Sequence, residues 1–180
     1  MKNKKGFTLV ELLAVIVILA VIILIAINAV LPQMAKARKN SFADEVMNYG
    51  NGAVNKYVSD NADEDDTTGD IGTGVCYTLK QLHGEYVSKN DSSYTGIVVL
   101  KRNADNANLT DKFVFIASNK FYYNSINDKT DDPWDTTTSL KKISAKNVKD
   151  GGSSKLTFKD CCEYKQFLDS EYTCVASDRQ

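Results

Sequence analysis

Hydrophobic residues dominate the start of the chain. No polar side chain occurs between Glu11 and Asn28, and back to Phe7 only Thr8 and Glu11 interrupt the apolar run. The segment from Phe7 to Leu31 would make a helix of about 37 Å at ~1.5 Å per residue, which exceeds the ~30 Å hydrocarbon core of a bilayer. We therefore expect a membrane-spanning helix over residues 7–31.

A different pattern follows over residues 32–59, where apolar side chains recur every three or four positions. The recurring residues are Phe42, Val46, Tyr49, Ala53 and Tyr57. This spacing places them on one face of a helix, so we expect the helix to continue to about Ser59 and to pack this face on its own domain. Pro32 removes a backbone donor and clashes with the carbonyl of Asn28, which predicts a kink or a melted turn within residues 28–32.

The remaining residues, 60–180, have the pattern of a small sheet. Runs rich in β-branched and aromatic residues occupy residues 96–101, 112–117 and 120–126, with turn-type residues between them. The link Ser118-Asn119 predicts a tight hairpin and therefore an antiparallel meander. Weaker patterns predict a short helical turn that includes Leu79, Leu82 and Tyr86, and short strands at 84–87 and 156–158. The predicted fold class is α+β, with one long N-terminal helix on a three- or four-stranded antiparallel sheet.

Glu11 is unusual because it is an ionisable residue inside the apolar run, five residues after Gly6. A carboxylate at membrane depth needs a partner or a role. Cleavage after Gly6 would create a charged α-amine on Phe7, one helical turn from Glu11 and on the same face. Pairing could then be with the chain's own amine or with that of a neighbouring subunit. The alternative is that Glu11 only complements the helix dipole.

Residues 5–13 read Lys-Gly-Phe-Thr-Leu-Val-Glu-Leu-Leu. They resemble the class III leader and N-terminal helix of type IV pilins and the related type II secretion pseudopilins, and the resemblance covers about the first 60 residues. It implies that prepilin peptidase cuts after Gly6 and N-methylates Phe7, and that Glu11 serves filament assembly. Many pilins have a proline about where Asn28 stands, whereas this chain has Pro32 instead.

The resemblance also implies a domain order, a location and partners. The leader would be residues 1–6, the transmembrane and filament-core helix 7–31, its amphipathic half 32–59, and the extracytoplasmic globular domain 60–180. The subunit would cross the cytoplasmic membrane once, with its N-terminus in the cytoplasm, before it joins a pilus at the cell surface. Expected partners are identical or related pilin subunits, prepilin peptidase and the pilus assembly machinery.

The four cysteines are expected to form disulfides, because the implied extracytoplasmic location permits them. They are Cys76, Cys161, Cys162 and Cys174. A bond between the adjacent Cys161 and Cys162 would be strained. We therefore expect one of these two to pair with Cys174 and the other with Cys76, which would pin the C-terminal segment. The sequence leaves open which cysteine takes which partner.

Other function classes find little support. Loss of a leader with three lysines takes the formal side-chain charge from −1 to −4, which does not indicate a nucleic-acid binder. An ordinary secretory signal would have a shorter apolar core without Glu11. His83 is the single histidine, and no nucleophile, nucleotide-binding or zinc pattern occurs. The acid-rich stretch 60–70 lacks EF-hand spacing. We therefore expect no enzyme activity, cofactor or metal site.

Three alternatives to a major pilin stay open at this point. A type II secretion pseudopilin would use the same helix in a periplasmic filament. A minor pilin would act as an adhesin or a DNA-uptake subunit. An anchored enzyme would have to show turnover to which no motif in the chain points.

Overall fold

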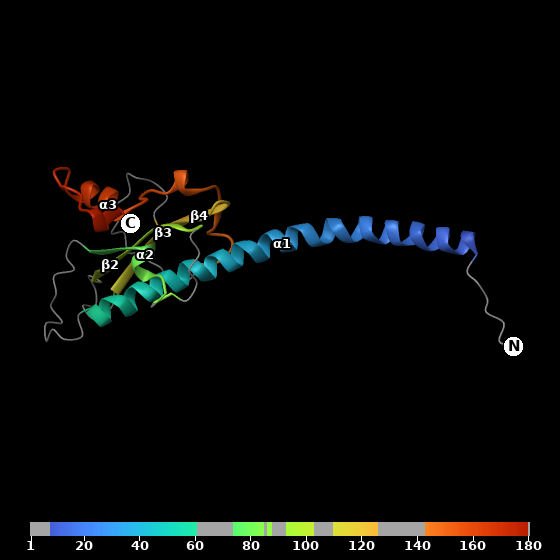
Figure 1. The fold of residues 1–180 in the computed structure, drawn as a ribbon, viewed down its shortest axis with the longest axis horizontal. Helices are drawn as coiled ribbons and strands as arrows, with labels where there is room; N and C mark the ends of the chain where they lie inside the picture. Colours follow the sequence, from blue (N-terminus) through green and yellow to red (C-terminus); the bar gives the residue numbers. More distant parts are fainter. Residues whose placement is uncertain are drawn as a thin grey trace. The chain divides into compact units, whose positions relative to one another are not determined.

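The computed structural model describes residues 8–60, 74–84, 86–87, 93–102, 110–125 and 143–179. Within these ranges the chain forms two compact units, Met1–Arg38 and Lys39–Gln180. Gly6 and Phe7, the acid-rich stretch beyond Asp60 and the end of the strand expected at 120–126 lie outside the described residues. Figure 1 shows the elements by their labels.

The first element, α1, is one helix from Leu9 to Asp60, with Pro32 inside it. The expected melted turn at 28–32 is wrong, because all five residues are helical. A proline removes only one donor from the ladder of helical hydrogen bonds, and the bonds on either side keep the helix together. The side-chain amide of Asn28 donates to the carbonyl of Leu24 at 3.3 Å, so this polar group is also satisfied within the helix.

The sheet has five antiparallel strands in the order β1-β2-β3-β4-β5, where three or four were expected. Their bounds are β1 Val75–Thr78, β2 Thr95–Arg102, β3 Thr110–Ala117, β4 Phe121–Asn124 and β5 Lys149–Asp150. The central pair β2–β3 has the longest register, from Thr95 opposite Ala117 to Arg102 opposite Thr110. The tight connection expected at Ser118-Asn119 joins β3 to β4, where the Ser118 N–H donates to the Phe121 carbonyl at 2.8 Å.

Two of the weaker strand predictions are wrong. Of the strand expected at 84–87, the described residues Gly84, Tyr86 and Val87 lie in no strand, and Val87 makes only an isolated bridge to His83. Residues 156–158 are irregular, whereas a short strand that was not predicted, β5, forms earlier at Lys149–Asp150. The short helical turn is confirmed as α2, Leu79–Leu82. Short elements depend on what they pair with, so their own residues specify them weakly.

One face of the sheet packs on the second half of α1, as predicted. Val98, Leu100, Val114 and Ile116 come from this face and are fully buried. They form one hydrophobic cluster with Phe42, Val46, Tyr49 and Ala53 of α1, which are the residues of the predicted helical face. Burial of these side chains is the main stabilising contribution that holds α1 to the sheet.

The opposite face of the sheet is also buried, which the sequence analysis did not anticipate. Ile97, Val99, Phe113 and Phe115 form a second cluster with Leu156, Phe158, Cys161 and Tyr164 of the C-terminal segment. That segment includes α3, Cys161–Leu168, and the 3-10 turns η2, Ser153–Lys155, and η3, Ala176–Arg179. Figure 1 shows α1 and α3 on opposite sides of the strands. The continuous apolar run of β2 is typical of a strand buried on both faces.

Two disulfides join the C-terminal segment to itself and to the sheet. Cys76 of β1 bonds Cys161 at the start of α3, and Cys162 bonds Cys174. This is one of the two pairings that the sequence left open. Asp160 begins α3, where its carboxylate accepts a hydrogen bond from the Glu163 N–H at 2.8 Å. The helix start therefore directs Cys161 to the sheet and its neighbour Cys162 to another face.

Candidate functional site

Thr8 and Glu11 close the first turn of α1 with reciprocal hydrogen bonds. The Thr8 backbone N–H and hydroxyl both donate to Glu11 Oε2, each at 2.9 Å, and the Glu11 backbone N–H donates to Thr8 Oγ1 at 3.3 Å. This geometry is a capping box, in which the side chains of the N-cap residue and of the third helical residue satisfy each other's backbone donors. Glu11 therefore stabilises the helix start within the single chain.

The role of Thr8 was missed in the sequence analysis, although its signal was there. A threonine followed three positions later by a glutamate, directly before an apolar run, is the sequence pattern of a capping box. The charge of Glu11 by itself predicts pairing with an amine or with the helix dipole, but not the bonds to Thr8. The local bonds to Thr8 give the carboxylate a more specific structural role than the dipole does.

Gly6 and Phe7 are the predicted processing residues, and they lie outside the described residues. The peptide bond between Phe7 and Thr8 still limits how far the Phe7 amine can lie from Glu11. A chain that began at Phe7 would carry its α-amine on the residue directly before Thr8, whose own nitrogen lies 2.9 Å from Glu11 Oε2. The carboxylate is thus held at the end of the helix where the new positive charge would form.

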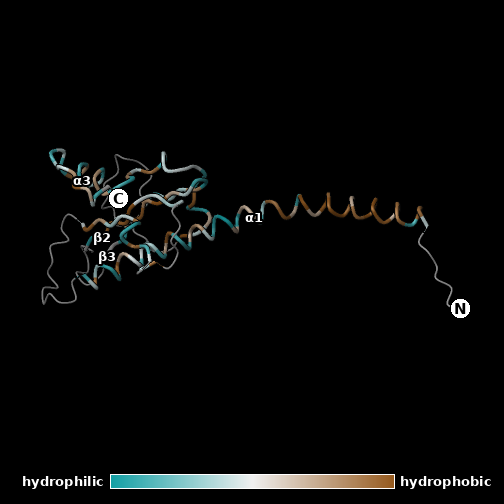
Figure 2. The backbone as a smooth tube through the Cα atoms, viewed as in Figure 1, coloured by the Kyte–Doolittle hydropathy of each residue, from teal (hydrophilic) through white to brown (hydrophobic). Residues whose placement is uncertain are grey.

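The apolar part of α1 is exposed along its length. Every large hydrophobic side chain from Leu9 to Met34 is between 46 and 80% exposed, and Figure 2 shows the hydrophobic colouring of this stretch. In the described part of the chain, α1 is the one helix long and apolar enough to cross a membrane. A helix that is apolar all round is stable only in lipid or among other helices, so this surface requires an environment other than water.

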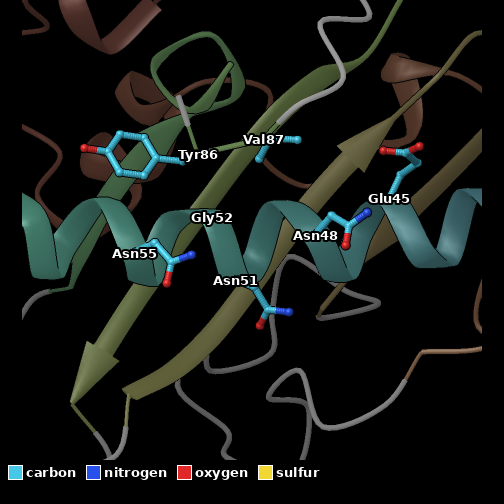
Figure 3. Close-up of a pocket in the computed structure, with 7 residues that line it drawn as sticks. All are labelled: Glu45, Asn48, Asn51, Gly52, Asn55, Tyr86 and Val87. Atoms are coloured by element: carbon cyan, nitrogen blue, oxygen red, sulfur yellow. The ribbon is translucent and has the colours of Figure 1, made fainter. Parts of the chain in front are cut away.

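A pocket of about 340 Å³ lies beside the second half of α1. Gly52 is one of its lining residues, and the absence of a side chain there lets Tyr86 and Val87 approach the helix (Figure 3). The other lining residues are Glu45, Asn48, Asn51 and Asn55. This lining combines amides, one carboxylate and one aromatic ring, and it contains no nucleophile paired with a base.

His83 and the four cysteines are not arranged for nucleophilic catalysis. His83 Nε2 lies 2.7 Å from the hydroxyl of Tyr49, a fully buried residue of the α1 core face. All four cysteines are bonded in disulfides, so none of them offers a thiolate to a histidine or to zinc. Among the described residues, no group of three or more histidine, cysteine or acidic side chains is placed to hold a metal ion.

The C-terminal segment contains a compact ionic cluster. Lys165 Nζ donates to Asp178 Oδ1 at 2.8 Å, and the Tyr172 hydroxyl and the Val175 N–H donate to Asp178 Oδ2 at 2.9 and 3.2 Å. Burial by itself would raise the pKa of the Asp178 carboxyl, but the hydrogen bonds from Lys165, Tyr172 and Val175 outweigh it and hold this pKa below its usual value. The cluster ties η3 to α3.

Residues 1–27 match the family described as the prokaryotic N-terminal methylation motif. The chain carries a type IV pilin-like class III leader. The matched range includes Gly6, Phe7 and Glu11, and it ends within the exposed apolar helix. No curated protein and no solved structure matches the chain.

The pilin-like leader lies directly before the helix start that Thr8 and Glu11 cap. The methylation motif supports a type IV pilin- or pseudopilin-like protein, and the proteins that share this motif are structural rather than enzymatic. Such a leader implies processing by prepilin peptidase and assembly with other pilin subunits. The apolar helix directly behind it fits a membrane-anchored protein of this class.

Proposed function

We propose that this chain is a structural subunit of a type IV pilus, assembled after prepilin peptidase cleaves between Gly6 and Phe7 and methylates the Phe7 amine. One observation carries the proposal. A class III leader is followed at once by a helix whose apolar side chains from Leu9 to Met34 are exposed on every face. In the membrane, lipid covers this surface, and in a pilus, the same helix of other subunits covers it.

In this proposal Glu11 sets how subunits dock. Its carboxylate is expensive to keep in a hydrocarbon environment without a cation. The methylated amine of Phe7 supplies that cation, either on the same chain or on a neighbour that is shifted along the helix. The bonds to Thr8 hold the carboxylate at the helix start, where it is ready to accept the amine. Subunits therefore add with a fixed lengthwise shift.

The remaining parts of the proposal concern location and role. Residues 1–6 are the leader, residues 7–31 the membrane and filament helix, residues 32–59 its amphipathic half, and residues 60–180 the extracytoplasmic domain. The N-terminus lies in the cytoplasm until the subunit leaves the membrane for the pilus. No substrate is converted, because the subunit acts by assembly alone.

Electron microscopy of surface fibres tests the proposed function. Cells that express the gene should carry fibres containing this protein, and cells without it should lack them. Fibres confined to cells with an active type II secretion system would support a pseudopilin instead. Presence at low abundance, in fibres built from another subunit, would indicate a minor pilin.

Mass spectrometry of the purified protein tests the processing step. The mature chain should begin with N-methylated Phe7. A Gly6→Ser variant should keep the leader and remain in the membrane, because the peptidase site is altered. A wild-type protein that still begins with Met1 would contradict the proposal.

A further inference from the structure

Three charged residues of α1 beyond the apolar run, Lys36, Arg38 and Asp44, have no ion-pair partner on their own helix. Arg38 and Asp44 are exposed and take part in no ion pair within the described ranges. Helical ion pairs need a spacing of three or four residues, and no acid lies at that spacing from Arg38 and no base from Asp44. The same helix does form such a pair elsewhere, between Lys56 and Asp60 at 3.0 Å.

Asp44 lies on an exposed helix face with an uncommon composition. The face comprises Ser41, Asp44, Asn48, Asn51 and Asn55, spaced alternately three and four residues apart. Such spacing places the five side chains on one face of the helix. Asparagine is a weaker helix former than the lysine or glutamate usual on a solvated face. Figure 3 shows the three asparagines along the helix. Asn51 accepts a hydrogen bond from Lys112 Nζ at 2.9 Å. Around Asp44, the short side chains of Ser41 and Asn48 leave room for another helix to approach closely.

We propose that Arg38 of one subunit pairs with Asp44 of a neighbouring copy whose α1 runs parallel to it and is shifted along the helix axis. The inference rests on the proposed pilus function and names the contact that continues helix docking outside the apolar run. Parallel alignment follows because every copy enters the membrane in the same direction. Six residues separate the two positions, which is about 9 Å along the helix axis. The neighbouring copy would therefore be shifted by about 9 Å, or by less if the two side chains reach toward each other.

Because Arg38 and Asp44 point in different directions, the same contact can repeat from one subunit to the next. Six residues of an α-helix turn it by about 600°, which leaves Arg38 and Asp44 roughly 120° apart around the axis. Each subunit therefore presents Arg38 from one face and Asp44 from another. A contact between two different faces is heterologous and generates an open filament when the rotation does not close.

The direction of the shift agrees with that expected for Glu11. The Phe7 amine precedes Glu11 by four residues, and Arg38 precedes Asp44 by six. In both pairs the cation lies nearer the N-terminus than the acid, so a neighbour shifted in one direction serves both. The difference of two residues is about 3 Å along a helix, which the long arginine side chain can span.

Charge reversal in the full-length chain, expressed in its own cells, tests the pair. Arg38→Asp and Asp44→Arg should each cause loss of sheared surface fibres, whereas the double variant should restore them. Lys36→Asp is the matched control, because Lys36 lies two residues from Arg38 and roughly 200° away around the helix. This control should assemble as the wild type does.

A cross-linking measurement covers the case in which a reversed variant does not accumulate. Cells with Arg38→Cys and Asp44→Cys together should give a ladder of linked subunits with a short bis-maleimide, since the native cysteines are all in disulfides. Each single variant should give none. Normal fibres from both charge reversals, or no ladder from the double cysteine variant, would overturn this pair while wild-type fibres uphold the pilus function. Absence of fibres from wild-type cells would overturn both.

Discussion

At the scale of single residues, Glu11 has a structural role in one chain and a proposed role between chains. Its carboxylate accepts two hydrogen bonds from Thr8, which caps the helix. The charge of the same group is what a neighbouring amine would recognise. These two roles depend on different properties of the side chain, so conservative variants can separate them.

Glu11→Gln should abolish fibres without loss of the helix. Glutamine retains an oxygen for the Thr8 N–H, because a capping box accepts Glu or Gln at this position, but it has no charge for the amine. Circular dichroism in detergent should show unchanged helix content, and microscopy should show no fibres. Thr8→Ala is the converse control, since it removes the cap and keeps the charge, and its fibres should persist. Abundant fibres from Glu11→Gln would assign Glu11 to capping alone.

Gly52 is required where the chain at residues 86–87 crosses α1. A β-carbon at this position would lie 2.7 Å from Val87 Cγ2 and 3.1 Å from the Tyr86 carbonyl oxygen. Alanine gains about 1 kcal/mol in helix propensity over glycine, but overpacking costs about 1–3 kcal/mol. Gly52→Ala should therefore destabilise the fold by about 1 kcal/mol in thermal unfolding. Asn55→Ala, on the exposed face, should instead stabilise it slightly, and the same sign for both variants would contradict this explanation.

At the scale of elements, the C-terminal segment depends on charge. The pKa of Asp178 is lowered in the fold. Burial by itself would lower the pKa of Lys165, but its hydrogen bonds to Asp178 and Tyr172 outweigh burial and raise this pKa. Stability from the lowered acid is present above its unfolded pKa of about 4 and is lost as the pH falls through the folded value. The raised pKa of Lys165 keeps its contribution up to about pH 10 and loses it above the folded value.

Hydrogen exchange of residues 161–179 should therefore accelerate as the pH is lowered below about 4, after correction for intrinsic rates. Asp178→Asn should remove this pH dependence. It should cost roughly 1–2 kcal/mol at neutral pH, less than a fully buried pair, because the Lys165 side chain is 36% exposed. An unchanged acid response in the variant would show that other carboxyls control this segment.

The two disulfides should contribute unequally. The Cys76–Cys161 bond spans 85 residues and the Cys162–Cys174 bond spans 12, which gives about 4.5 and 3 kcal/mol in the chain-entropy account. Chemical denaturation should show a larger loss for the Cys76→Ala/Cys161→Ala double variant than for Cys162→Ala/Cys174→Ala. The reverse order would mean that local packing around α3 outweighs loop closure.

At the scale of the whole molecule, the two compact units need different surroundings to be stable. The unit Met1–Arg38 exposes apolar side chains, whereas the unit Lys39–Gln180 contains both hydrophobic clusters and both disulfides. A fragment of residues 39–180, exported to an oxidising compartment, should be a soluble monomer with both disulfides formed. Size exclusion and mass spectrometry measure this directly.

A shorter fragment of residues 55–180 is the matched control. It lacks Phe42, Val46, Tyr49 and Ala53, which cover one sheet face. Exposure of that face should make it aggregate. A well-folded shorter fragment would mean that α1 is not needed to complete the core.

The sequence by itself determined the features that depend on neighbouring residues. Three such features are the apolar run, the leader motif and the helical face from Phe42 to Tyr57, each of which is a pattern of residues close together in the sequence. The structure confirms the helix over the apolar run and the packing of the helical face. Strands β2 and β3 were also predicted, because their own residues favour a buried strand. Local periodicity carries this information without knowledge of the fold.

Only the tertiary structure decided the features that depend on distant partners. β1 and β5 are strands because β2 and β4 pair with them, and the second sheet face is covered because the C-terminal segment returns to it. The choice between Cys161 and Cys162 followed from where α3 begins. Neighbouring residues on a helix point about 100° apart, so the position of the helix start, and not the spacing of the cysteines, determined which of them faces Cys76.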